Sequence, residues 1–278
     1  MLRRRGEAQA PREATVAVGA VDAAVQAGVA EALLHHMLFM RGQIPVPFRQ
    51  LQQCVDDFGA AEAAAAAGAG GALARGHLRK RSHMRKLQRY VEEMSGVCQG
   101  VSELCRDLGT VRSVSFMFGA SATVPREMVT LSFSTAAAAA ASSTRPDVDG
   151  IKRKVVREVI GSFSDLPCIN LPSTCLYVSV TCNCNHSTPP PQNLTGEGAS
   201  LFSIREGFSP TLRRNRGMPL LSVALEAPAR AKLDQATLPA AANASASAGD
   251  EHQQVVFVLR RAVRGLSKPT VDALFAVN

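Results

Sequence analysis

Apolar residues recur at three- and four-residue steps in three stretches of the chain, a spacing that predicts amphipathic helices at 21–40, 85–108 and 150–162. The first pattern stops at Gly42, which can adopt the left-handed conformation that closes a helix, and Pro45 and Pro47 prevent its continuation. A shorter apolar pattern at 48–55 predicts a brief additional helix. A buried helix is therefore expected to lead into a rigid extended segment.

Alternating apolar residues elsewhere predict β-strands, at 111–118, 128–134, 174–181, 201–204, 220–225 and 254–259. Together these elements indicate an α+β class, with three helices packed on a mainly antiparallel sheet. Residues 1–15 are expected to form a flexible tail and 16–278 a single domain. Low-complexity sequence, much of it rich in alanine, is expected to form flexible insertions near 59–76, 136–147, 184–198 and 228–252.

The predicted helix at 150–162 carries more apolar residues than one helix face can bury. Val155, Val156, Val159 and Ile160 cannot all point inward, so one set should be partly exposed. Basic residues surround it, at Lys152, Arg153, Lys154 and Arg157. Exposed apolar side chains with a charged rim are typical of a protein interface, and an ordinary core helix is the alternative for any single valine.

The formal net charge of +8 is compatible with a basic chromosome- or nucleic-acid-associated structural protein. Clustered Lys and Arg favour nucleic-acid binding because they release counterions from the phosphate backbone. The basic clusters are scattered along the chain instead of forming one stripe. Trp is absent and only 2 Tyr are present, which argues against an aromatic platform for stacking bases. A solvated face or an acidic protein partner explains the charge better.

No sequence pattern for an active site is present: the chain lacks G-x-S-x-G, H-E-x-x-H and a phosphate-binding glycine loop with its lysine. The 7 cysteines include no C-x-x-C pair, and that usage is typical of a reducing compartment. Cys182, Cys184 and His186 alternate along one predicted strand, whereas zinc ligands usually converge from turns. Neither a metal nor another cofactor is therefore expected, and the chain is predicted not to be an enzyme.

The N-terminal residues 1–5 resemble the start of an organellar transit peptide, which leaves an organellar enzyme as a third hypothesis. Glu7, Glu13 and Asp22 argue against it, because transit peptides contain few acidic residues. Asp22, Gln26 and Glu31 also interrupt the one long apolar stretch. No membrane partner is therefore expected.

The most specific motif lies at 41–48, where the chain reads R-x-Q-[IL]-P-[LV]-P-[FY] and is followed by the pair Gln50 and Leu51. The helical pattern at 85–108 and the strand, small-residue turn and strand at 111–134 follow at a suitable distance. In these features the chain resembles the comet proteins, spindle-checkpoint silencers that bind the closed form of the mitotic-arrest-deficient protein Mad-two. The match in order and spacing covers roughly the first half of the chain; residues 163–180 match more weakly, and the C-terminal third more weakly still.

The resemblance implies a HORMA-like fold, in which 253–264 would form a C-terminal seat-belt-like segment against the sheet. It implies a non-enzymatic adaptor that binds closed Mad-two, or a related HORMA protein, and acts on no small-molecule substrate. The partner-binding positions carried over from the family are Phe39, Met40, Arg41, Lys152, Val155, Val156 and Val159. Met40 stands where animal members have a polar glutamine, so a hydrogen bond from this position is not expected.

The resemblance also implies a second partner, the pachytene-checkpoint AAA+ ATPase, which opens closed Mad-two. Family members contact it through a Pro-Lys pair before a late strand, and the nearest match here is Pro210, Thr211, Arg213 and Arg214. A nuclear and cytoplasmic location follows from the resemblance, with kinetochore or chromosome association during division. A meiotic role in synapsis or recombination is a further expectation.

Overall fold

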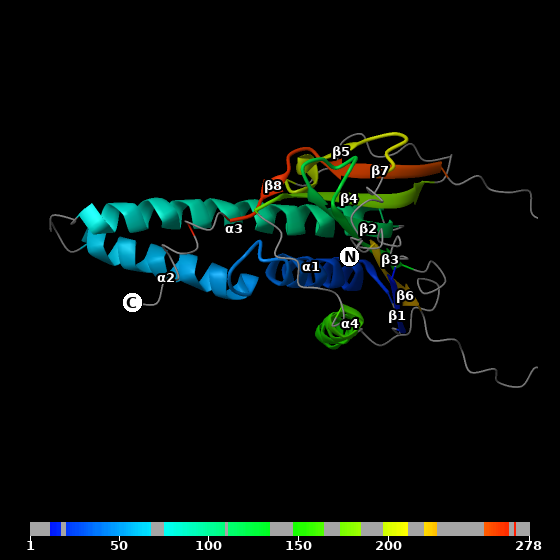
Figure 1. The fold of residues 1–278 in the computed structure, drawn as a ribbon, viewed down its shortest axis with the longest axis horizontal. Coiled ribbons are helices and arrows are strands. Elements are labelled where there is room, and N and C mark those ends of the chain that lie inside the picture. The colour runs from blue at the N-terminus through cyan, green and yellow to red at the C-terminus, as the bar shows by residue number, and fades with distance from the viewer. Residues whose placement is uncertain are drawn as a thin grey trace, which may run out of the picture.

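The computed structural model describes residues 12–17, 21–67, 75–108, 111–133, 147–163, 173–184, 197–210, 220–226, 253–266 and 270. Within them the helices are α1 (Ala23–Met40), α2 (Phe48–Ala67), α3 (Arg75–Leu108) and α4 (Val148–Phe163). The strands are β1 (Arg12–Ala17), β2 (Val111–Gly119), β3 (Glu127–Phe133), β4 (Cys175–Cys184), β5 (Phe202–Ile204), β6 (Leu220–Glu226), β7 (Gln253–Leu259) and β8 (Val263–Arg264). A short 3-10 helix, η2 (Ala199–Leu201), precedes β5. Figure 1 shows α1, α3 and α4 gathered on one side of the sheet.

The sheet is mixed, with the strand order β1-β6-β3-β2-β4-β7-β5 and with β8 pairing β4. β6 runs parallel to both β1 and β3, and the other pairs are antiparallel. The sequence pattern did not predict β1, and the expected tail 1–15 is wrong from Arg12 onward because those residues pair with β6. The mainly antiparallel pairing expected from the sequence is found in the middle of the sheet, where β2 runs antiparallel to both of its neighbours, β3 and β4.

A continuous core fills the space between helices and sheet. α1 begins at Asp22, whose side chain accepts a 2.8 Å hydrogen bond from the Val25 amide and so satisfies one free donor of the first turn. α1 is long and apolar enough to cross a membrane by composition, yet half of that window is buried inside this fold. Its buried side chains include Val25, Val29, Leu33, Leu34, Met37 and Leu38. α1 is therefore the central core helix, packed against α3 and α4.

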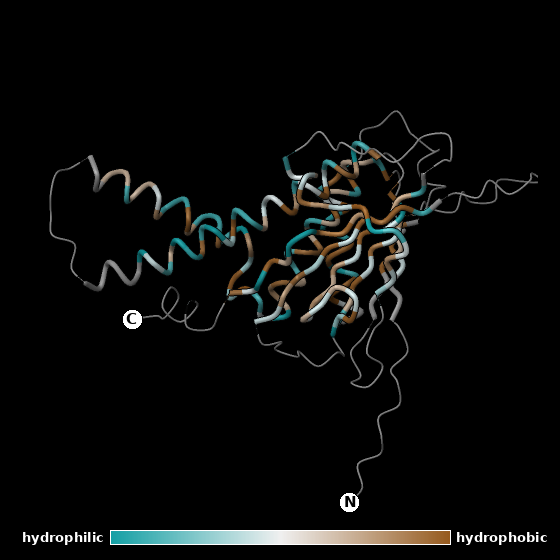
Figure 2. Tube along the Cα trace, turned by 90° about the horizontal axis from the view of Figure 1, so that it is seen from above, coloured by the Kyte–Doolittle hydropathy of each residue, from teal (hydrophilic) through white to brown (hydrophobic). Residues whose placement is uncertain are grey.

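Helices α2 and α3 form an antiparallel arm that projects from the sheet (Figure 1). The predicted brief helix at 48–55 in fact continues through the alanine run to Ala67. The expectation of a flexible insertion is therefore wrong for 59–67, because alanine has the highest intrinsic helix propensity and needs no apolar face to continue a helix. Figure 2 shows that the arm is far less hydrophobic than the body of the molecule. The brief helix predicted at 48–55 is therefore a full-length fourth helix, α2.

The C-terminal segment 253–264 lies in the sheet. β7 pairs with β4 on one side and with β5 on the other, and β8 pairs with the beginning of β4. The late strand expected at 254–259 is confirmed by these pairings. The belt-like role of this segment stays a prediction.

Candidate protein-interaction site

The two sets of apolar residues on α4 have different environments. Val155 and Val159 are fully buried in the core, whereas Val156 is half-buried and Ile160 is 47% exposed. The prediction that one set would be partly exposed is confirmed. Val155 and Val159 themselves cannot contact a partner in this structure, because α4 packs its inner face against α1 and β1.

Positive side chains flank the exposed set on α4. Arg153 and Arg157 are exposed, and Lys152 is half-buried. The Lys152 ammonium lies 3.7 Å from Asp149, and its aliphatic chain covers Gly28 of α1, where a Cβ would come 2.5 Å from Lys152 Cε. Lys152 therefore packs α4 onto α1 with its stem while its charge reaches the surface. We call Lys152, Arg153, Val156, Arg157 and Ile160 the α4 face.

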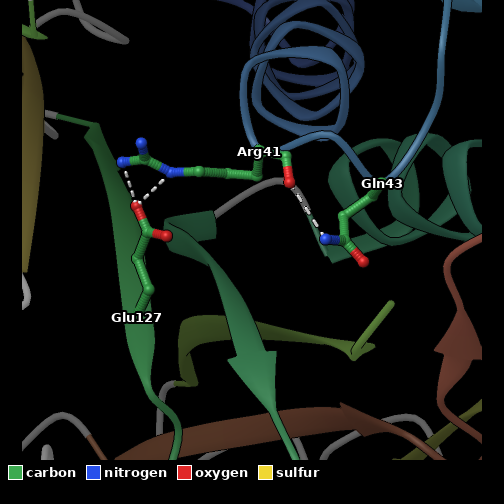
Figure 3. Close-up of polar contacts among 3 residues, drawn as sticks. All are labelled: Arg41, Gln43 and Glu127. Atoms are coloured by element: carbon green, nitrogen blue, oxygen red, sulfur yellow. Dashed lines mark hydrogen bonds and ion pairs between the residues drawn. The ribbon is translucent and has the colours of Figure 1, made fainter. Parts of the chain in front are cut away.

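The predicted contact residues at the end of α1 also differ in exposure. Phe39 is 41% exposed and Met40 is half-buried, but Arg41 is only 5% exposed. Arg41 Nε donates a 2.8 Å hydrogen bond to Glu127 Oε1 on β3, and a terminal guanidinium nitrogen reaches the same oxygen (Figure 3). Burial raises the pKa of Glu127, and the charge and hydrogen bonds of Arg41 oppose that shift. Arg41 therefore holds α1 to the sheet instead of facing a partner.

Gln43 is a second buried polar residue of the motif and connects three parts of the fold. Its side-chain amide donates to the Arg41 carbonyl at 3.0 Å, and its side-chain oxygen accepts from the Thr174 amide at 2.9 Å. Its backbone carbonyl accepts from the Leu266 amide at 3.1 Å. Figure 3 shows Gln43 turned toward the end of α1 beside the Arg41–Glu127 pair. The sequence motif thus marks a fold-holding cluster, a role that its residue types alone did not reveal.

The exposed residues of the two helices lie at different levels of α1. α4 crosses α1 at Gly28, and in Figure 1 α4 is seen nearly end-on while α1 runs across the view. Phe39 follows Gly28 by eleven residues, or roughly 16 Å along the helix axis at 1.5 Å per residue. A partner that contacts both the α4 face and Phe39 must therefore span this part of α1.

The family model named p31comet, described as "Mad1 and Cdc20-bound-Mad2 binding", matches residues 2–192. The chain belongs to the p31comet family. Mad2 is the Mad-two of the sequence resemblance, and membership implies Mad2 binding, a spindle-checkpoint role and a HORMA-like fold. The p31comet family consists of Mad2-binding adaptors and is not a known enzyme family. A search of curated proteins found no match.

The residues matched by the family model can be compared with those that carried the sequence resemblance. The family-model match extends past α4 and β4, so p31comet similarity covers more of the chain than the first half identified from motifs. Of the predicted ATPase contacts, Pro210 is half-buried after β5, and Thr211, Arg213 and Arg214 lie outside the described residues. These four contacts stay predictions.

Proposed function

We propose that this chain is a non-enzymatic adaptor that binds the closed conformer of Mad2 through the α4 face, with Phe39 and Met40 at the end of α1 as a second contact. The observation that supports it most is the placement of Val156 and Ile160: they are apolar, accessible and flanked by cations, while Val155 and Val159 of the same helix are fully buried. Apolar centres with a charged rim are the usual anatomy of protein interfaces.

The adaptor would present closed Mad2 to the pachytene-checkpoint AAA+ ATPase for conversion to the open form. Preference for one conformer can only trap that conformer, so net opening needs the ATP hydrolysis of the ATPase. Pro210, Thr211, Arg213 and Arg214 are the proposed contacts to the ATPase. We place the protein in nucleus and cytoplasm, with kinetochore or chromosome association during division and a meiotic role in synapsis or recombination.

Binding to conformer-locked Mad2 tests this proposal. The purified chain is passed over immobilised Mad2 locked closed and Mad2 locked open, at equal density and physiological salt. We expect retention on the closed form and at least tenfold weaker retention on the open form. Equal binding to both, or binding to neither, would contradict the proposal.

A basic groove on the arm favours a second candidate function, association with chromosomal nucleic acid. Arg81, Ser82, Arg85, Lys86 and Arg89 line a surface pocket of about 340 Å³ on α3. Arg81 also pairs with Glu62 of α2, which neutralises part of the groove. Contacts to phosphates would make DNA binding fall steeply with salt, by a slope close to the number of contacts. DNA binding that is absent at physiological salt would remove this candidate.

A further inference from the structure

A cluster of metal-ligating side chains lies where α1 packs against α3. Glu31 and His35 come from α1, and Cys98 comes from α3. One ligand atom of each residue lies within 4.8 Å of the other two, and this is the one such group found among the described residues. The proposed adaptor function uses none of these three side chains.

The local structure explains why the three side chains meet. Glu31 and His35 are four residues apart, so they share one face of α1. Cys98 follows Val97 on the side of α3 that packs against the core, with its thiol partly covered. The His35 ring stacks on Phe48, the first residue of α2, with ring centroids 4.1 Å apart and planes inclined by 17°. The imidazole is thus held in place without any contribution from an ion.

The spacing of two of the donor atoms, one each from Cys98 and His35, matches a tetrahedral zinc site, and the Glu31 donor lies within 4.8 Å of both. Cys98 Sγ lies 3.6 Å from His35 Nε2. Zinc bonds of ~2.3 Å to sulfur and ~2.05 Å to nitrogen at a tetrahedral angle place those two atoms about 3.6 Å apart. A weak hydrogen bond between thiol and imidazole would also have this length, so the Glu31 carboxylate beside them is the feature that distinguishes an ion site.

The surroundings leave room for an ion and a fourth ligand. The three side chains line a pocket of about 340 Å³ together with Phe48, Gln52, Ser95, Gln99 and Ser102.

We propose that Glu31, His35 and Cys98 form a zinc site that joins α1 to α3 and leaves its fourth position to water. The combination of thiolate, imidazole and carboxylate selects Zn²⁺ over the hard cations Mg²⁺ and Ca²⁺, which prefer oxygen ligands. Zinc sites with three protein ligands keep water in the fourth position, whereas structural zinc sites have four protein ligands. None of the three ligands is among the residues proposed to contact Mad2.

Cobalt substitution tests the site directly. The full chain, without a histidine tag and freed of metal by chelation, is titrated with Co²⁺ and then with Zn²⁺. We expect one equivalent of Co²⁺ to give tetrahedral visible bands and a near-ultraviolet charge-transfer band from the thiolate, both abolished when Zn²⁺ displaces cobalt. A chain that gives no such bands at micromolar Co²⁺ would show that the 3.6 Å contact is only a hydrogen bond.

Variants then assign the ligands. Cys98→Ser should remove the charge-transfer band, and His35→Phe, which keeps a ring to stack on Phe48, should weaken Zn²⁺ binding at least tenfold. Cys175→Ser on β4 is the matched control, because this half-buried free thiol lies in another part of the fold, and it should change neither property. If Cys98→Ser keeps the band, the assignment is wrong.

A measurement on the unmodified chain covers the case in which a variant fails to fold. Alkylation of each cysteine by a thiol reagent is followed by peptide mass spectrometry with and without one equivalent of Zn²⁺. We expect Zn²⁺ to slow the alkylation of Cys98 at least tenfold and to leave the rate at Cys54 and Cys175 unchanged. Equal rates at Cys98 with and without Zn²⁺ would overturn the proposal.

Discussion

Arg41, which begins the motif at 41–48, and helix α4 were both predicted to touch the partner, yet Arg41 is buried and α4 has an exposed apolar side. At the end of α1, Arg41 and Gln43 are 5% and 1% exposed and bind other parts of the chain. On α4, Ile160 is 47% exposed and Val156 half-buried. The most recognisable motif of the sequence therefore holds the fold together, and the proposed contact surface lies on the less distinctive helix α4.

The difference has a physical reason. A buried guanidinium must keep its carboxylate and its hydrogen bonds, so the position accepts few substitutions and gives a strong motif. An exposed apolar residue in a binding surface needs only shape and hydrophobicity, which many residues supply. Variants at Glu127, Ile160 and Val159 can separate the fold-holding role from the binding role.

Glu127→Gln should have the largest effect. It leaves the Arg41 guanidinium buried without its carboxylate, and an arginine cannot neutralise itself by losing a proton. We expect a loss of ~3–5 kcal/mol in the free energy of unfolding, measured by urea denaturation. Unchanged stability would mean that Arg41 is solvated in solution.

Arg41→Met gives the complementary control, because a carboxyl group left alone can take up a proton. The pKa of Glu127 is already raised by burial, and removing Arg41 raises it further. A carboxyl whose folded pKa exceeds its unfolded value, ~4.3, favours the fold below that value and loses this contribution as pH rises through the folded pKa. The variant should therefore be closest to the parent chain in acid and fall behind it toward neutral pH, as a stability series from pH 4 to 8 would show.

Ile160→Glu should affect binding and leave the fold intact. The side chain is nearly half exposed, so the cost in stability is within ~0.5 kcal/mol. A charge placed at the centre of an apolar contact costs ~2 kcal/mol or more, which is about a 30-fold loss of affinity for closed Mad2. Surface plasmon resonance and a thermal melt on the same sample measure the two effects together.

Ile204→Glu is the matched control for Ile160→Glu. Ile204 is 37% exposed on β5, at the end of the sheet opposite β1, against which α4 packs. The same added charge there should leave Mad2 affinity unchanged. If both variants weaken binding equally, the loss reflects net charge and the α4 face is not the contact.

The sequence predicted the elements that carry a strong side-chain pattern. The helical stripes of α1, α3 and α4 and the alternation along β3 follow from burial on one face, which periodicity records directly. β1 could not be found this way, because Arg12–Ala17 contains one large apolar residue, Val16, and so shows no clear alternation. The alanine run in α2 also lacked a side-chain pattern, because a helix on an arm needs no apolar stripe.

The candidate site was predictable only in part. The sequence showed that α4 had too many apolar residues for one face, but which set is buried depends on how α4 meets α1 at Gly28. Glu31 and His35 have a visible four-residue spacing, whereas Cys98 joins them from 63 residues beyond His35 through tertiary packing. Gln43 was part of the motif, and its partners Thr174 and Leu266 are brought to it only by the fold.

A pair of truncations three residues apart on α4 includes the variant with the smallest predicted effect, Val156→Ala. Val159→Ala removes two methyl groups from a fully buried site and should cost ~2 kcal/mol of stability, from lost burial plus the cavity that remains. Val156→Ala, on the half-buried outer side, should cost below ~0.5 kcal/mol of stability while weakening closed Mad2 binding a few-fold. Because the chemical change is the same in both variants, any difference between them in urea denaturation or in Mad2 titration is due to the position of the valine on α4. If the two variants lose equal stability, both valines belong to the core and the α4 face shrinks to Ile160 and its cations.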